Sequence, residues 1–213
     1  MIERPERTAI IIDGSLASAV ALAAAREARV QTGGAPAAVW IDAGLDENAP
    51  LRDRAARSMA SAMGCTVMGP QEPVADARTS GVDRAVLLLI AGTASCHAGR
   101  PEVLWPVTIE SAADTSPSDQ AAAAAREIDR AVLVTRLLSL DATDHGHVSV
   151  GVTCPFAEMP DRGVAELAVD LAAPVELCWW VGQTSASARR EQARWEGLLR
   201  SCGHPGMSPS RGA

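Results

Sequence analysis

The chain has 213 residues, a net charge of −7 and 47% apolar residues. This length and apolar content suffice to bury a sizeable core, which excludes a chain disordered over most of its length. No basic run exceeds two residues, so the composition argues against nucleic acid as the main partner. Apolar runs as long as Ala85–Ala91 are too short to span a bilayer, and we expect no membrane partner.

Apolar runs alternate with Ala-rich or amphipathic stretches, which predicts strands alternating with helices. We expect strands at 8–12, 37–42, 65–68, 102–109, 148–152 and 175–179, and helices at 16–29, 50–63, 82–97, 120–140, 163–171 and 185–201. The alternation indicates an α/β fold with a doubly wound, mostly parallel sheet of about five strands and helices on both faces. Residues 1–202 are expected to form one domain, and the Gly/Pro/Ser-rich residues 203–213 a disordered tail.

Cysteine usage and the first residues indicate the compartment. The five cysteines are scattered and form no C-x-x-C pair, which is typical of reduced thiols in a cytosolic protein. Charged residues occupy the positions where a secretory signal would place its apolar segment, namely Glu3, Arg4, Glu6 and Arg7. We therefore expect a cytoplasmic protein.

The turn after the first strand is the first candidate site, because doubly wound sheets bind ligands beyond the carboxyl ends of their strands. The sequence contains no G-x-G-x-x-G after this strand, no G-x-x-x-x-G-K-[ST], no G-x-S-x-G and no H-E-x-x-H. Dinucleotide binding, P-loop hydrolysis, the α/β-hydrolase triad and zincin chemistry therefore lose their usual sequence support.

The segment Ala9–Val20, AIIIDGSLASAV, is similar to the pyrophosphate-binding loop of PP-loop ATPases, which typically carry S-G-G-x-D-S. Gly14 and Ser18 match that motif, whereas Asp13, Ser15 and Ala17 replace its first Ser, second Gly and Asp. A carboxylate at the loop would repel a triphosphate by about 1 to 4 kcal/mol at about 4 Å. A tight turn between any strand and helix would also produce this pattern.

The C-terminal third resembles 7-cyano-7-deazaguanine synthase more specifically. Three consecutive segments, VSVGVTCPFAEM (148–159), VAELA (164–168) and PVELCW (174–179), are similar to that family's strand, P-L-x-D-L-x-K, helix and L-T-W-S-C order. The closing residues 189–205 resemble its last helix and G-I-P turn. The resemblance implies an adenine-nucleotide α-hydrolase-like fold, a homodimer, and ATP with Mg²⁺ in an active member.

The departures fall on the family's functional positions. Its lysine would fall at Asp161, and its first zinc cysteine at Val181; Gly182, Ser185 and Ala188 occupy the stretch where the other cysteines would lie. Since structural zinc takes four Cys or His ligands, we expect no metal site. The pair His145 and His147 could chelate a metal on one strand face, but its Asp-rich surroundings favour a solvated turn.

These residues predict a degenerate, non-catalytic relative of that synthase, with a regulatory, scaffolding or small-ligand-binding role. Its vestigial pyrophosphate loop would comprise Asp13, Gly14, Ser15 and Ser18. No cofactor is expected, and no catalytic residue is assigned. The alternative is an active ATP-dependent ligase of queuosine or deazapurine biosynthesis, using ATP and Mg²⁺. A third hypothesis has Asp13 acting as an acid or base near the strand ends.

Two further predictions concern the C-terminal region. Trp179 and Trp180 are adjacent on the expected last strand, so that one of them would face away from the sheet. Because tryptophan is enriched at interfaces, this region is the predicted homodimer contact. Glu191 and Arg194 are expected on a solvated face of the last helix.

Overall fold

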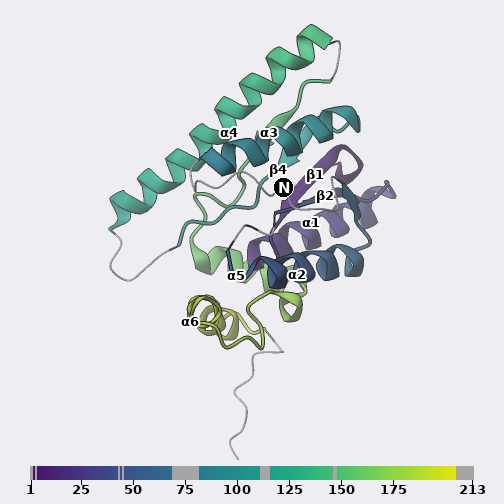
Figure 1. The fold of residues 1–213 in the computed structure, drawn as a ribbon. Coiled ribbons are helices and arrows are strands. Elements are labelled where there is room, and N and C mark those ends of the chain that lie inside the picture. Colours follow the sequence, from purple (N-terminus) through teal and green to yellow (C-terminus); the bar gives the residue numbers. More distant parts are fainter. Residues whose placement is uncertain are drawn as a thin grey trace, which may run out of the picture.

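The structure, a computed structural model, describes residues 2, 4–42, 44, 46–68, 82–110, 116–145 and 148–204 (Figure 1). After a short 3₁₀ helix, η1 (Pro5–Arg7), strands and helices alternate as the sequence predicts. They are β1 (Thr8–Ile12), α1 (Leu16–Thr32), β2 (Ala38–Ile41), α2 (Ala49–Ala62), β3 (Thr66–Met68), α3 (Val82–His97), β4 (Glu102–Leu104), α4 (Pro117–His145), β5 (Gly151–Thr153), α5 (Asp161–Asp170), η2 (Val175–Leu177) and α6 (Ala186–Ser201).

The five strands form one parallel sheet in the order β3-β2-β1-β4-β5, which confirms the predicted doubly wound architecture. The chain first moves outward from β1 to β3 and then returns to place β4 on the other side of β1. This reversal of direction makes β1 the topological switch point. The turn that follows β1 therefore lies at the sheet edge where ligands bind in folds of this type.

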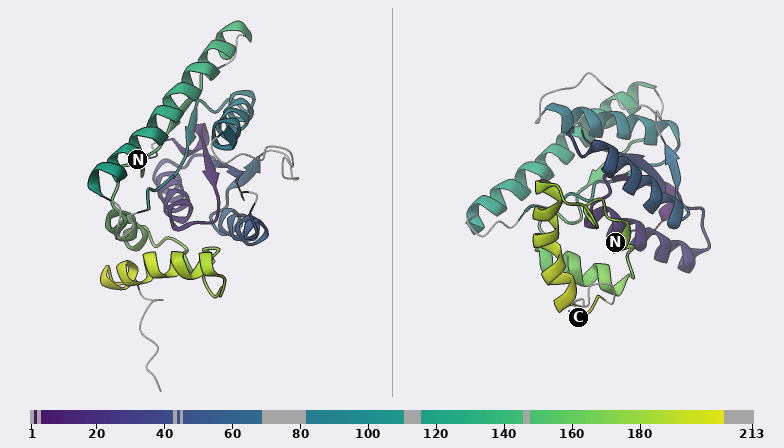
Figure 2. Two further views of the ribbon diagram at one scale, coloured as in Figure 1. Left: turned by 60° about the vertical axis from the view of Figure 1, so that its left-hand side comes forward. Right: turned by 60° about the horizontal axis from the view of Figure 1, so that its bottom comes forward.

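Side chains alternate along β1 and divide the core between the two faces of the sheet. Ile10 and Ile12 pack in one cluster with residues of α1, α2, α5, η2 and α6. Ala9 and Ile11 pack in a second cluster with residues of α3 and α4. Figures 1 and 2 show α1 and α2 on one face of the sheet and α3 and α4 on the other. All five residues of β1 are buried, as expected for the central strand.

Helix α1 is buried along most of its length, which explains its alanine content: small side chains let β1, α2 and α5 approach it closely. Ser15 caps its start by accepting a hydrogen bond from the Ser18 N–H, and Gly33 ends it in a left-handed conformation, with φ of 69°. The cap that begins the helix thus belongs to the same turn as the candidate site.

Three predicted strands differ from the structure. The run at 175–179 is wrong as a strand: it forms the 3₁₀ helix η2 and a turn. An apolar run this short fits a buried turn as well as a buried strand. Strand β4 stops at Leu104 because Pro106, two residues on, has no N–H for the ladder. Strand β5 covers Gly151–Thr153 rather than 148–152.

Several predictions fall outside the described residues. This group comprises most of the predicted tail, at 205–213, and His147 with its neighbour at 146. For the described residues, none of the helices is both long and apolar enough to cross a membrane.

Candidate functional site

The turn between β1 and α1 is held tightly by its neighbours. Gly14 has a left-handed backbone, with φ of 77°, and a Cβ added there would lie 2.8 Å from Ala55 Cβ and 3.0 Å from the Arg52 carbonyl oxygen. Its own carbonyl oxygen accepts a hydrogen bond of 3.0 Å from the Trp179 N–H. The position therefore needs glycine for conformation and for space, since α2 contacts it directly.

The four residues predicted for the loop lie together, and Asp13, Ser15 and Ser18 hydrogen-bond to one another. The Asp13 carboxylate oxygen Oδ1 accepts hydrogen bonds from the Ser15 N–H at 2.9 Å and from the Ser18 hydroxyl at 2.7 Å. The Ser18 Oγ accepts one from the Asp13 N–H at 3.0 Å, and the Ser15 Oγ accepts one from the Ser18 N–H at 3.3 Å. Ser18 is only 1% exposed. Three backbone N–H groups of the turn thus already have acceptors inside it.

A second carboxyl group, that of Asp42, lies near the turn. Asp42 follows β2, donates its N–H to the Ile12 carbonyl at 2.8 Å, and accepts the Gly44 N–H at 3.2 Å. Burial, reinforced by the negative charge of Asp13, raises the pKa of the Asp42 carboxyl, and the Gly44 hydrogen bond and the charges of Arg52 and Arg84 act in the opposite direction. An anionic ligand at this edge would add a further negative charge beside the Asp42 carboxyl, whose ionised form burial already disfavours.

Helix α6 carries a further carboxyl group with a raised pKa, that of Glu191, toward the same edge. Burial raises the pKa of Glu191, to which the charges of Glu110 and Asp13 contribute; Arg194 and the hydrogen bond from Trp195 act in the opposite direction. That hydrogen bond joins the Trp195 indole N–H to the Glu191 carboxylate at 2.8 Å. The predicted solvated face is wrong here, because Trp195 is core and draws Glu191 inward with it.

Asp161 and Arg194 form a buried ion pair that the sequence did not reveal. The guanidinium donates to both carboxylate oxygens, at 2.6 and 2.8 Å, and the two side chains are 10% and 12% exposed. Arg194 also donates to the Ile109 carbonyl at 3.1 Å and stacks 4.4 Å from the Trp195 ring. Asp161, at which the sequence resemblance would place a lysine, therefore has its charge neutralised within the fold. No motif in the sequence links the two residues, and only the need of a buried carboxylate for a cationic partner could have suggested the pair.

The residues at which the sequence resemblance would place zinc cysteines have structural roles of their own. Val181 packs against the core, and Ser185 caps α6 by accepting the Ala188 N–H at 3.2 Å. Among the described residues, no group of three or more His, Cys, Asp and Glu side chains is arranged to hold a metal ion. The metal content of the protein stays a prediction.

Trp179 and Trp180 do not form an exposed surface. They are 6% and 0% exposed, and both belong to the core cluster on the α1 side of the sheet. The Arg52 guanidinium lies 5.0 Å from the centre of the Trp179 ring. The argument that placed a dimer contact at these residues is therefore wrong, because it depended on a strand that the chain does not form. Whether the protein dimerises is a separate question.

Cys154 and Cys178 are expected to resist Ellman's reagent at pH 8 in the folded protein. Burial, aided by Glu127, raises the pKa of the Cys154 thiol to about 12, and burial also raises the pKa of Cys178 well above its ordinary value. At pH 8 a thiol with a pKa of about 12 is thiolate in roughly one molecule in ten thousand, and the thiolate is the reactive form. Titration in urea should reach all five thiols of the chain. Rapid labelling of either residue in the native protein, mapped by mass spectrometry, would contradict this expectation.

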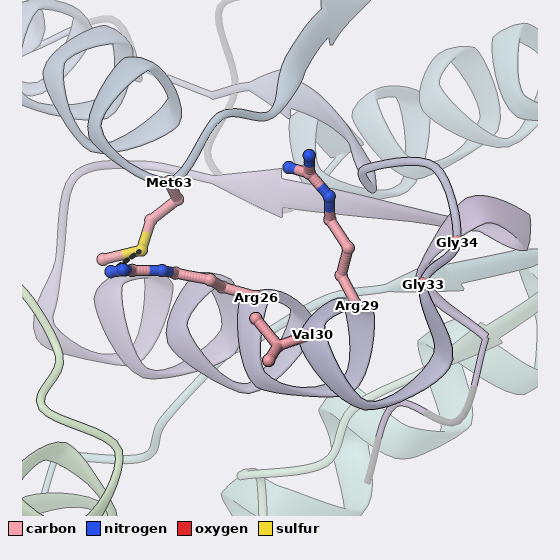
Figure 3. A pocket seen from close by; sticks show the side chains of 6 residues that line it. All are labelled: Arg26, Arg29, Val30, Gly33, Gly34 and Met63. Carbon is pink, nitrogen blue, oxygen red and sulfur yellow. Dashed lines mark hydrogen bonds between the residues drawn. The ribbon is translucent and has the colours of Figure 1, made fainter.

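A shallow surface hollow of about 440 Å³ lies at the C-terminal end of α1, away from the turn after β1. Figure 3 shows Arg26 and Arg29 extending from α1 beside Gly33, with Met63 facing them from the end of α2. The Arg26 guanidinium lies 4.0 Å from the Met63 sulfur. This hollow is open and contains none of the residues predicted for the site.

Comparison with known proteins identifies the fold class. No family model matches the sequence, and no curated protein matches it. Among solved structures the chain is similar to a U34-tRNA thiolase, NcsA from Methanococcus maripaludis, solved with its 4Fe–4S cluster. The match has a TM-score of 0.50 at 16% sequence identity and covers 94% of this chain and 67% of NcsA. The chain therefore has an adenine-nucleotide α-hydrolase-like fold, as the sequence predicted.

Proposed function

We propose that this protein is a non-catalytic relative of the PP-loop ATPases, nearest in its sequence pattern to 7-cyano-7-deazaguanine synthase. It uses the nucleotide-binding fold for a regulatory, scaffolding or small-ligand-binding role, in the cytoplasm, without ATP-dependent ligation. The observation that carries the proposal is the closed turn after β1. There the Asp13 carboxylate accepts the Ser15 N–H and the Ser18 hydroxyl, which are donors that a pyrophosphate would need.

The physical argument is one of competition. A pyrophosphate binds at a helix N-terminus by accepting hydrogen bonds from free backbone N–H groups. In this turn an anionic ligand would have to displace a carboxylate that is covalently part of the loop and always present. It would also meet the charge of Asp13 and, when Asp42 is ionised, that of Asp42, which the charges of Arg52 and Arg84 offset in part. Losing two charge-assisted hydrogen bonds, at about 1.5 to 3 kcal/mol each, weakens binding by roughly two to four decades.

Calorimetry with ATP and Mg²⁺ tests the proposal directly. We expect a dissociation constant in the millimolar range or weaker for the natural chain, and no pyrophosphate release with 7-carboxy-7-deazaguanine and ammonium. The double variant Asp13→Ser/Ser15→Gly restores the Ser and the second Gly of the family's loop, and it should bind ATP at least about tenfold more tightly because a competing carboxylate is gone. Asp170→Asn, at the exposed end of α5, removes the same charge elsewhere and should change nothing.

The alternative, an active ATP-dependent ligase with Mg²⁺, is favoured by one feature. Gly14 keeps the left-handed conformation of a phosphate-binding turn, and this turn leads directly into the N-terminus of α1 at the switch point of the sheet. Low-micromolar ATP binding by the natural chain, or turnover that Ser18→Ala abolishes, would overturn the non-catalytic proposal and establish this alternative.

A further inference from the structure

Of the described residues that line the hollow at the C-terminal end of α1, two are arginines and none is acidic. Arg26 and Arg29 lie three residues apart, so both stand on the same side of the helix. Figure 3 shows their side chains diverging, with Arg26 extending toward Met63 and Arg29 away from α1. The Arg29 Nη1 would lie 3.3 Å from a Cβ added at Gly64, just beyond the end of α2. The hollow therefore has a guanidinium group at two separate points.

In the part of the chain that the structure describes, neither guanidinium has a carboxylate partner. Arg100, which is half-buried like Arg29, shows how this fold satisfies a structural arginine: it donates to the carbonyl oxygens of Pro5 and Thr8 at 3.3 and 3.0 Å. No described residue accepts a hydrogen bond from the Arg29 guanidinium. Its N–H donors are therefore open to an acceptor from outside the chain.

Two acidic side chains near the hollow, those of Glu6 and Glu27, do not cancel this charge. Glu27 accepts a hydrogen bond of 3.3 Å from the Gln31 amide, and residues one or two apart on a helix do not face each other. The Glu6 carboxylate lies beside Gly34 and interacts with the charge of Arg100. The C-terminal ends of α1 and α2 contribute about half a negative charge each, which the two guanidinium groups outweigh. The hollow is therefore positive in a chain whose net charge is −7.

We propose that this hollow binds an acidic peptide segment of a protein partner, in which carboxylates flank an apolar side chain. The carboxylates pair with Arg26 and Arg29, because a guanidinium group donates two parallel hydrogen bonds to a carboxylate. The apolar side chain contacts Val30, which is 77% exposed, beside the Met63 sulfur. None of these residues belongs to the turn after β1, so the inference does not depend on whether that turn binds ATP.

The shape and composition of the hollow favour a peptide over other anions. Small-molecule sites bury about 70 to 90% of their ligand, whereas this hollow is shallow and open and leaves a small ion largely in water. A peptide covers it as part of a wider contact, and arginine and methionine are both enriched at protein interfaces. Nucleic acid favours clustered cations and aromatic side chains on which bases stack, and none of the described lining residues is aromatic.

NMR titration of the ¹⁵N-labelled full chain with the peptide EDLDE, blocked at both ends, tests the proposal. We expect the Nε–Hε signals of Arg26 and Arg29 to shift and saturate with a Kd of about 1 mM or lower. The neutral peptide QNLNQ should bind at least about tenfold more weakly, because it keeps the leucine and loses every carboxylate. EDSDE, which keeps the charges and loses the leucine, should bind about threefold more weakly.

Three arginine variants assign the binding to the hollow. Arg26→Gln should weaken EDLDE binding about threefold, and Arg26→Gln/Arg29→Gln about tenfold, whereas Arg126→Gln, exposed on α4 at the other face of the sheet, should change nothing. Because Arg26 is exposed, its single variant keeps the test valid even if the double variant is less stable. Asp13→Ser/Ser15→Gly should bind the peptide like the natural chain, which separates this site from the turn.

Four results would each overturn the proposal. They are an absence of saturation, equal binding of EDLDE and QNLNQ, equal effects of Arg26→Gln and Arg126→Gln, and tighter binding of another anion at the same signals. Inorganic phosphate and a uridine decanucleotide are the probes for that last result. Tighter binding of phosphate would assign the hollow to a small anion, and tighter binding of the oligonucleotide would assign it to nucleic acid.

Discussion

Replacing Asp161 with alanine is expected to lower the free energy of unfolding by about 3 to 5 kcal/mol. The substitution leaves the Arg194 guanidinium buried, with the Ile109 carbonyl and the Thr108 hydroxyl as acceptors but no carboxylate. Removing one partner of a buried pair costs more than the pair contributes, because the remaining charge keeps its desolvation cost. The same guanidinium stacks on Trp195, so the packing of α6 against the fold should loosen as well.

Urea denaturation measures this effect, and α5 supplies a matched control. Glu166 forms an ion pair with Arg162 on the same helix, but those side chains are 51% and 71% exposed. Glu166→Ala should therefore cost less than about 1 kcal/mol, as exposed pairs do. Equal losses for Asp161→Ala and Glu166→Ala would show that the burial of the Asp161 pair has no energetic consequence.

Gly14→Ala is expected to destabilise the fold by about 2 to 5 kcal/mol. About 1 to 2 kcal/mol comes from placing a residue with a Cβ in the left-handed region, and a further 1 to 3 from overlap. The overlap is with the Ala55 side chain and the Arg52 carbonyl of α2, at 2.8 and 3.0 Å from the new Cβ. Neither neighbour is the end of a flexible side chain, so relief requires α2 to move.

Gly33→Ala separates the two contributions, because Gly33 has nearly the same φ, 69°, with no atom within 4 Å of an added Cβ. It should cost only about 1 to 2 kcal/mol, the conformational part alone. Thermal unfolding of the two variants under the same conditions gives the difference. If the two substitutions lowered Tm equally, the contact between α2 and the turn would contribute nothing to stability.

The order of elements and the place of the site could be predicted because both depend on local pattern. Alternating apolar and amphipathic stretches predicted the five-stranded sheet, and the position of Asp13–Ser18 after the first strand predicted the turn at its switch point. The hydrogen bonds among Asp13, Ser15 and Ser18 were not predicted. A carboxylate at this position can repel a ligand or accept the loop's own donors, and the sequence alone does not decide between them.

The C-terminal region was predicted less well, since its structure depends on contacts distant in sequence. Glu191 and Arg194 occur among charged neighbours, which is typical of a solvated helix face, yet both turn inward beside Trp195. The run at 175–179 has the composition of a buried strand but follows Pro174 and folds as a 3₁₀ turn. Contacts with α1 and with the turn after β1 decide which residues of this region are buried, and local periodicity carries no information about those contacts.

The hydrogen bond from Trp179 to Gly14 has a consequence for how the chain acquires its structure. It joins residues 165 positions apart, so the turn after β1 cannot reach its final form until most of the chain has left the ribosome. Contacts of such long sequence separation slow folding, and the half-formed sheet would wait with the apolar side of α1 uncovered. During synthesis the first βα unit would then be the part most in need of a chaperone, although it is the first to be made.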